Sequence, residues 1–342
     1  MSEYLKFPYL VDLHVHCRDF KQNHKETYQT ASEAAVAGGV TFIGDMPNNS
    51  ELTDSLIKIQ EKKELVKNEK VDFGFYLGTL GDENQNFKEC YDEVLGLKVY
   101  MSETTGGFIV NDKDKLGHIF KSWDCEKPIL VHAEENTLST AIDLAEKYDR
   151  ILYVCHVSRK DEIDLIKKAK EKRPGKVFAE VTPHHLFLDS DSSKNNPYRQ
   201  MKPPLSNLED RKALWKAVND GIIDTIGSDH APHTREEKMS KNPPFGVPGL
   251  ETTLPMLLKA EQIGLITREK IIELTHLNPI KIFELREQKN SFVEIKKDSP
   301  IVISGENLKT KCKWTPFEGF EVRDILVRTT LRDEVVYNME NL

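Results

Sequence analysis

Two histidines separated by one residue end the apolar segment 10–16, which reads Leu-Val-Asp-Leu-His-Val-His. Because side chains alternate along a β-strand, His14 and His16 would point to the same side of a sheet. Such a pair on its own is more often structural than functional. Further donors also end short apolar segments, namely His132, His156 and Asp229. With only 11 histidines among 342 residues, this recurrence is improbable by chance.

Imidazole and carboxylate donors without paired thiolates are typical of a catalytic site for zinc or a similar divalent ion. Lys98 lies in the apolar segment 97–100, and taken alone it would be interpreted as structural. An ammonium beside metal ions would be repelled. A neutral, desolvated lysine amine can instead react with CO2 to form a carbamate, whose two oxygens could bridge two cations. The sequence therefore predicts two divalent metal ions, with Zn2+ expected, and CO2 bound as a carbamate on Lys98.

Eight short β-like segments alternate with segments of helical period, as in Ile163, Ile166 and Ala169. A second helical pattern comprises Leu52, Leu56, Ile59 and Val66. The expected strands are Leu10–Val15, Val40–Asp45, Asp72–Leu77, Leu97–Tyr100, Ile129–His132, Ile151–Cys155, Val177–Val181 and Ile223–Ser228. This alternation predicts an α/β fold, a (β/α)8 TIM-type barrel over residues 9–286. A doubly wound open sheet is the alternative, but no Gly-x-Gly-x-x-Gly follows the first strand. The donors would then meet at the carboxyl ends of the strands, where barrel active sites lie.

The charge and the apolar content of the chain exclude some classes of binding partner. The formal charge of −8 argues against a nucleic-acid or anionic-membrane surface, and no apolar stretch is long enough to span a membrane. Five scattered cysteines without a Cys-x-x-Cys suit reduced thiols, so we expect a cytoplasmic protein. After residue 286 the pattern changes to four short β-like pieces, which with residues 1–8 should form a small, mostly C-terminal β appendage. The expected pieces are Phe292–Ile295, Ile301–Ile303, Ile325–Arg328 and Val335–Tyr337.

Ordered motifs along nearly the whole chain resemble the dihydroorotases of the amidohydrolase superfamily, in particular the type fused into the animal multifunctional pyrimidine-synthesis protein. They are Asp-Leu-His-Val-His-Cys-Arg at 12–18, Met-Pro-Asn at 46–48, Gly-Leu-Lys-Val-Tyr at 96–100, Val-His-Ala-Glu at 131–134, Cys-His-Val-Ser at 155–158, Pro-His-His-Leu-Phe-Leu at 183–188, Ser-Asp-His-Ala-Pro-His-Thr at 228–234, Pro-Gly-Leu-Glu-Thr at 248–252 and Trp-Thr-Pro-Phe-Glu-Gly at 314–319. The resemblance implies that His14, His16 and Asp229 hold one metal. It likewise implies that His132 and His156 hold the second, with carboxylated Lys98 between the two.

The activity implied is reversible hydrolysis of the cyclic amide of dihydroorotate to N-carbamoyl-L-aspartate, a step of pyrimidine synthesis. A hydroxide held between the two cations would attack the amide, and Asp229 would serve as general acid and base. By the same resemblance Arg18, Asn48 and His233 read the substrate carboxylate. The segment 102–111 resembles a mobile loop that brings Thr104 over the substrate, although Thr105 is an equal choice. Lys202 stands where relatives have another polar residue and could also meet the carboxylate.

Alternatives remain open at several positions. Arg18 could make a salt bridge at the barrel rim, Asn48 could be a turn residue, and His233 could be a capping residue or a residue that supports a site residue from behind. Cys155 and Glu180 could form an auxiliary metal site, or could be a buried thiol and a carboxylate that orients a ligand. A hydantoinase, dihydropyrimidinase or allantoinase is the nearest enzymatic alternative. An inactive scaffold for aspartate transcarbamoylase is the other, but it should have lost metal ligands. The expected partners are a small-molecule substrate, a second copy in a homodimer and an aspartate transcarbamoylase.

Overall fold

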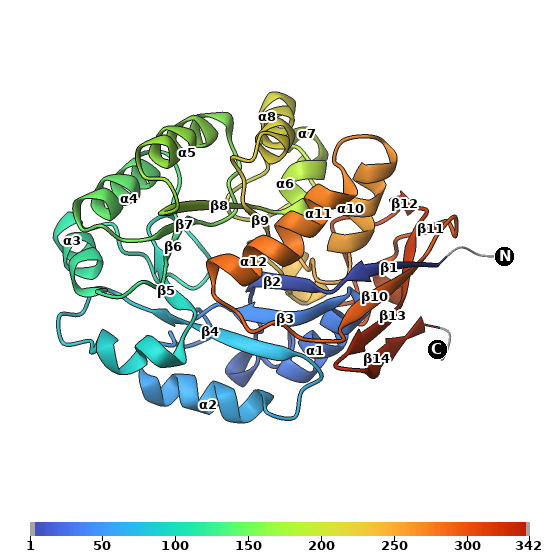
Figure 1. The fold of residues 1–342 in the computed structure, drawn as a ribbon, viewed down its shortest axis with the longest axis horizontal. Helices are drawn as coiled ribbons and strands as arrows, with labels where there is room; N and C mark the ends of the chain where they lie inside the picture. Colours follow the sequence, from blue (N-terminus) through green and yellow to red (C-terminus); the bar gives the residue numbers. More distant parts are fainter. Residues whose placement is uncertain (1–3, 340–342) are drawn as a thin grey trace.

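Eight parallel strands form one sheet in the order in which they follow along the chain (Figure 1). The structure, a computed structural model, describes residues 4–339. The strands are β2 (Leu10–Val15), β3 (Val40–Asp45), β4 (Asp72–Gly78), β5 (Gly96–Tyr100), β6 (Ile129–His132), β7 (Leu152–Val154), β8 (Val177–Val181) and β9 (Thr225–Ile226). The sheet closes where Val15 pairs in parallel with His230, just beyond β9. The predicted (β/α)8 barrel is confirmed.

Helices connect successive strands and cover the outside of the barrel (Figure 1). The longer helices are α1 (Tyr28–Ala37), α2 (Leu56–Val66), α3 (Lys113–Ser122), α4 (Asn136–Lys147), α5 (Lys160–Lys172), α8 (Leu208–Asn219) and α10 (Thr253–Gln262). The shorter ones are α6 (Pro183–Phe187), α7 (Ser190–Ser193), α9 (Arg235–Lys238), α11 (Arg268–Ile272) and α12 (Asn278–Ile282). Short helices of other types are η1 (Phe20–Gln22), η2 (Phe87–Glu93), η3 (Pro197–Arg199), η4 (Glu273–Leu277) and η5 (Gly305–Asn307).

Apolar residues spaced by one helical turn attach these helices to the sheet. Helix α5 buries the predicted Ile163, Ile166 and Ala169. Helix α2 begins later than its apolar pattern suggested, because Leu52 pairs with Asn48 in a short antiparallel bridge that precedes the helix. The barrel strands are buried on both faces, so each one reads as a nearly continuous apolar run.

The last barrel strand is shorter than predicted. The expected strand covered 223–228, whereas β9 contains two residues. Side chains replace ladder partners here: the Asp224 carboxylate accepts from the backbone N–H of Ala179 at 2.7 Å. Likewise the Asp12 carboxylate accepts from the backbone N–H of Ser228 at 3.1 Å. These bonds free the chain to bend at Asp229, which a regular strand would hold extended.

Both ends of the described chain meet in a second, antiparallel sheet of order β1-β10-β13-β14. Its strands are β1 (Tyr4–Pro8), β10 (Phe292–Lys296), β13 (Ile325–Leu331) and β14 (Glu334–Asn338), while β11 (Ile301–Val302) and β12 (Glu321–Val322) pair separately. Val293, Ile295 and Leu326 share one apolar core with the barrel. We accordingly propose the boundaries 9–286 for the barrel and 1–8 with 287–342 for the appendage, of which 1–3 and 340–342 lie outside the described residues. Over residues 4–339, no helix combines the length and apolar character needed to cross a membrane.

Candidate metal centre and substrate cavity

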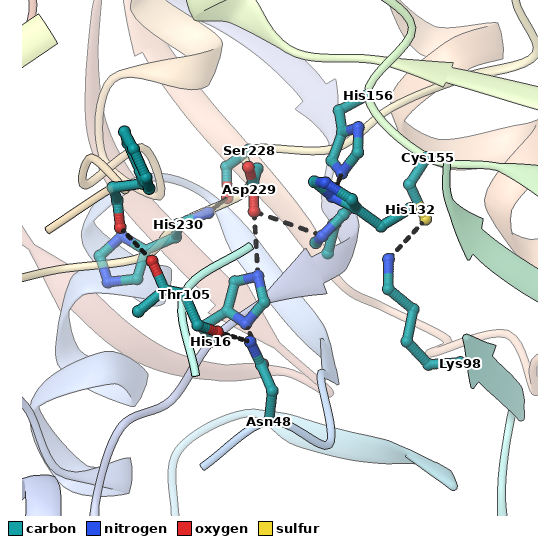
Figure 2. Close-up of polar contacts among 12 residues, drawn as sticks. His16, Asn48, Lys98, Thr105, His132, Cys155, His156, Ser228, Asp229 and His230 are labelled. Atoms are coloured by element: carbon teal, nitrogen blue, oxygen red, sulfur yellow. Dashed lines mark hydrogen bonds and ion pairs between the residues drawn. The ribbon is translucent and has the colours of Figure 1, made fainter. Parts of the chain in front are cut away.

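The six predicted ligand residues converge at the carboxyl ends of barrel strands, where all are buried. Figure 2 labels all of them except His14. They belong to five barrel strands or to the residues that directly follow them: His14 and His16 to β2, Lys98 to β5, His132 to β6, His156 to the segment after β7, and Asp229 to the turn after β9. Distances across the group are short. The ring centroid of His14 lies 5.4 Å from that of His16 and 5.3 Å from that of His156.

His14, His16 and Asp229 form the first half of this group. Asp229 Oδ1 lies 3.3 Å from His14 Nε2 and 3.0 Å from His16 Nε2. On the far side of His16, Nδ1 lies 2.6 Å from the Asn48 side-chain oxygen. Because that oxygen only accepts, the proton of His16 belongs on Nδ1 and Nε2 carries a lone pair. Burial lowers the pKa of His16 to about 4, which keeps the ring neutral. A lone pair and a carboxylate oxygen facing each other suit a cation between them.

Burial and the neighbouring charges together shift the pKa values of Asp229 and His14. Burial alone would raise the pKa of Asp229, but the facing rings of His14 and His16 hold it well below its usual range. Burial also disfavours a charged His14, yet the carboxylates of Glu180 and Asp229 raise the pKa of His14 to about 10. The same two carboxylates would attract a divalent cation.

His132 and His156 form the second half. His132 Nδ1 lies 2.8 Å from His156 Nε2, while His132 Nε2 lies 3.1 Å from the carbonyl of Glu103. Since a carbonyl accepts, the His132 proton belongs on Nε2 and the lone pair on Nδ1 faces the other ring. Burial lowers the pKa of both rings. His156 Nδ1 is buried without a hydrogen-bond partner in the described structure. Two neutral imidazoles this close, one with an unpaired nitrogen, also fit a metal.

Lys98 is completely buried beside these rings, and its Nζ donates to Cys155 Sγ at 3.0 Å (Figure 2). No ion pair of Lys98 occurs within residues 4–339. A lysine enclosed among imidazoles and a thiol has the chemistry expected of a carbamate-forming amine. The donor set therefore fits a pair of divalent ions, with three ligands in the first half, two in the second and Lys98 beside both.

Two of these residues have strained backbones. His156 and Asp229 have φ values of 37° and 48°, a region that favours glycine. Strain of this kind costs on the order of 1–3 kcal/mol and persists where the surroundings over-determine the conformation, often at functional sites. Both residues lie shortly after the ends of β7 and β9, where their side chains join the ligand group.

Cys155 and Glu180 both contact this group. Glu180 Oε1 lies 2.6 Å from His14 Nδ1, and the Tyr153 hydroxyl donates to Glu180 Oε2 at 2.9 Å. The ligand atoms of His14, Cys155 and Glu180 lie within 4.8 Å of one another. The arrangement is compatible with both sequence interpretations, an auxiliary metal site and a carboxylate that orients His14.

A cavity opens onto the ligand group, and four predicted substrate-binding residues line it: Arg18, Asn48, Thr104 and Lys202. Arg18 is only 3% exposed, and its Nε donates to the carbonyl of Pro232 at 3.3 Å. The Lys202 ammonium pairs with Glu103 at 2.9 Å. The free volume of about 30 Å³ holds roughly two water molecules, so a ring-sized substrate requires a wall to move.

His233 lies behind Arg18. Lys25 Nζ stands 3.2 Å from His233 Nδ1, and the Phe245 carbonyl stands 2.9 Å from Nε2. An ammonium only donates and a carbonyl only accepts, so Nδ1 accepts and Nε2–H donates. Arg18 Nη2 is 3.3 Å from the same Nε2. Burial and three neighbouring cations lower the pKa of His233, which keeps this ring neutral.

Sequence reasoning missed several residues of the site. Tyr100 lines the cavity with a buried hydroxyl that has no partner in the described structure, and Phe245 forms another wall. Asp12 accepts from the backbone N–H of His14 at 3.2 Å and of Ser228, which joins two ligand segments, and burial raises its pKa to about 6. Asp12 could have been found, because it opens the Asp-Leu-His-Val-His motif. Phe245 lies in a loop with no chemical signature.

Comparisons with known proteins find similar sequences and a similar fold. The sequence is 39% identical over 336 residues to the multifunctional protein CAD of Squalus acanthias, an alignment that covers 97% of this chain and 15% of that protein. It is 34% identical over 364 residues to a dihydroorotase of Pyrococcus furiosus, covering 98% and 82%. The fold matches L-hydantoinase from Arthrobacter aurescens with a TM-score of 0.91 at 27% identity, covering 99% and 86%. The chain thus spans about 15% of the multifunctional relative's length.

The similarity to dihydroorotases inferred from the motifs is thereby confirmed. A family model described as the amidohydrolase family matches residues 5–319, which include every candidate ligand. The chain belongs to the amidohydrolase family.

Proposed function

We propose that this chain is a dihydroorotase, which catalyses the reversible hydrolysis of the cyclic amide of dihydroorotate to N-carbamoyl-L-aspartate in pyrimidine synthesis. Relatives named dihydroorotase over most of both chains support the proposal. All six predicted ligand residues are present in the sequence, whereas an inactive scaffold would be expected to have lost some of them.

The observation that carries the choice of substrate is the buried Arg18 guanidinium on the cavity wall. A guanidinium can bind a carboxylate through two parallel hydrogen bonds. Dihydroorotate carries a carboxylate on its ring, whereas hydantoin and dihydrouracil do not. The amide N–H group of Asn48, which also lines the cavity, adds a donor that suits the same group, while the Nε2–H of the neutral His233 behind Arg18 is used by the Phe245 carbonyl.

The proposed reaction assigns distinct tasks to residues of this chain. When bound, two divalent ions, Zn2+ by our proposal, would activate water and polarise the amide carbonyl. Their ligands would be His14, His16, Asp229, His132 and His156, with carboxylated Lys98 between the two ions. The Asp229 carboxylate, ionised at neutral pH, accepts the proton of the attacking water and delivers it to the departing ring nitrogen. Ring closure requires Asp229 to begin protonated. Because hydrolysis creates a carboxylate, acid favours closure.

A substrate panel tests the proposal. The purified protein, supplied with Zn2+, is offered dihydroorotate, dihydrouracil, hydantoin and allantoin, and opening of each ring is followed directly. We expect dihydroorotate to be turned over with by far the highest kcat/KM. Preference for hydantoin or dihydrouracil would instead assign the chain to the hydantoinase branch of the family, and no turnover of any ring would favour a scaffold.

Further proposals follow from the same site. Thr104 and Lys202 are proposed to contact the substrate, and Cys155 with Glu180 to hold an auxiliary metal. A homodimer, an aspartate transcarbamoylase partner and a cytoplasmic location complete the proposal. Light scattering of the purified chain tests the dimer, and co-purification with a transcarbamoylase tests the partner.

A further inference from the structure

Lys238, the last residue of α9, is a completely buried lysine with an unusual set of partners. Its Nζ donates to the backbone carbonyls of Gln200 at 3.0 Å, Pro244 at 2.9 Å and Gly246 at 3.1 Å. Burial lowers the pKa of Lys238 to about 7. The three acceptors oppose this effect, because they match the three N–H bonds of an ammonium, whereas a neutral amine has only two. Burying an unpaired charge is costly, so the complete satisfaction of this group by main-chain oxygens is its compensation.

Two of the three carbonyls flank Phe245. The Phe245 carbonyl is itself an acceptor for two site residues, the His233 ring at 2.9 Å and the Thr105 hydroxyl at 3.0 Å. A carbonyl oxygen has two lone pairs, so both are used. The dashed line from the Thr105 hydroxyl in Figure 2 marks the second bond. The Lys238 ammonium thus binds the carbonyls of the residues on either side of Phe245.

The segment around Phe245 depends on such a contact. Gly246 has a φ of 126°, and a Cβ built there would lie 2.7 Å from the Ala231 carbonyl oxygen. The backbone therefore approaches the turn after β9 closely, with no side chain at Gly246 to fix it.

Thr105 belongs to the segment 102–111, which follows β5 and contributes Thr104 and Thr105 to the cavity wall. The cavity is too small for a ring-sized substrate, so this wall is a candidate to open and close. A bond from Thr105 to a fixed carbonyl on the opposite wall would favour the closed position.

We propose that Lys238 is a positioning residue, whose ammonium fixes the Phe245 carbonyl as the point where Thr105 docks when segment 102–111 closes. The inference deepens the proposed function, because closure would enclose dihydroorotate beside the metal centre.

Hydrogen–deuterium exchange of the peptide covering 102–111 tests the docking directly in the metal-replete protein. Thr105→Val removes the hydroxyl, and Thr105→Ser retains it. We expect exchange of this peptide to rise roughly 2- to 12-fold in Thr105→Val, the factor for one neutral hydrogen bond, and to stay near native in Thr105→Ser. Exchange unchanged in Thr105→Val would overturn the docking, and this arm does not depend on replacing Lys238.

Lys238→Met tests the positioning role, and Lys238→Arg retains the charge and donors. We expect Lys238→Met to raise loop exchange and lower kcat/KM for dihydroorotate by factors similar to those of Thr105→Val, with partial rescue in Lys238→Arg. Since both substitutions would act through the same bond, the double variant should be little worse than the poorer single variant. Independent, multiplying effects would overturn the proposal.

A core variant separates positioning from general destabilisation. Ile166 of α5 is completely buried away from the cavity, so Ile166→Ala should lower the thermal midpoint without changing exchange of 102–111. If Ile166→Ala raised loop exchange as much as Lys238→Met, Lys238 would be only a structural lysine. If the native protein failed to open dihydroorotate, the proposed function would fail while the exchange data still decided the docking.

Discussion

Replacing Arg18 by Met separates a dihydroorotase from its relatives most sharply. Arg18→Met keeps much of the length of the side chain in its buried position but removes the charge and the donors. A hydrogen bond to a charged group contributes about 1.5–3 kcal/mol, and removing one partner of a buried charge pair costs about 2–5 kcal/mol. At about 1.4 kcal/mol per factor of ten, kcat/KM for dihydroorotate should fall roughly 30- to 5,000-fold.

The matched substrate is dihydrouracil, which has the same scissile amide without the carboxylate. Its slow turnover should hardly change in Arg18→Met, so the two substrates should converge. The control is needed because Arg18 also donates to the Pro232 carbonyl at 3.3 Å, and losing that bond could disturb the site. An equal fall for both substrates would refute the reasoning, since Arg18 would then support the cavity rather than bind the substrate carboxylate.

Three other predictions concern the metal centre and the pH dependence of stability. The native chain should bind about two divalent ions and carry the added mass of one CO2, and Lys98→Ala should lose nearly all activity with partial rescue by a short carboxylate; full activity in a metal-replete Lys98→Ala protein would contradict the carbamate. Asp229→Asn should retain much of the metal but lower kcat at least ~10²-fold by removing the proton acceptor, and a near-normal pH–rate profile would assign that role elsewhere. Burial raises the pKa of Glu162 from 4.5 to about 7, so its contribution to folding is complete below pH 4.5 and is lost as the pH rises to about 7. At ~1.36 kcal/mol per pKa unit, this shift makes the free energy of unfolding about 3 kcal/mol smaller above pH 7 than below pH 4.5. Urea unfolding at several pH values should show that Glu162→Gln lacks this decrease. If the variant and the native protein had the same pH dependence, Glu162 would be ionised in the folded protein at neutral pH.

The barrel and its candidate ligands could be predicted because both depend on local sequence. Parallel strands buried on both faces must be apolar, so all eight were recognisable from short runs. Polar residues that end such runs must meet at one edge of the barrel, which brings His132 and Asp229 together although β6 and β9 lie far apart in the sequence. The short length of β9 was not predictable, because the bonds that replace its ladder come from the distant Asp12 and from Asp224.

Contacts that exist only in the folded chain escaped prediction. Lys238 ends the segment Arg-Glu-Glu-Lys at 235–238, which is typical of a solvated helix face. Its burial arises from Gln200 and the 244–246 segment, which no periodicity links to α9. The choice between Thr104 and Thr105 was also open in the sequence. In the structure both line the cavity, and Thr105 makes the bond to Phe245.

Several contacts join the candidate metal centre to segment 102–111, and one of them is made by the amide of Asn48. Its oxygen lies 2.6 Å from His16 Nδ1, and its nitrogen donates to the Thr105 carbonyl at 3.4 Å (Figure 2). The second bond is long and therefore the weaker of the two. If segment 102–111 opens, this bond is lost, while the Asn48 oxygen still fixes the proton and orientation of His16. The freed N–H group then faces the cavity and can donate to an incoming carboxylate. Asn48 can thus exchange the loop for the substrate without disturbing the ligand that it orients.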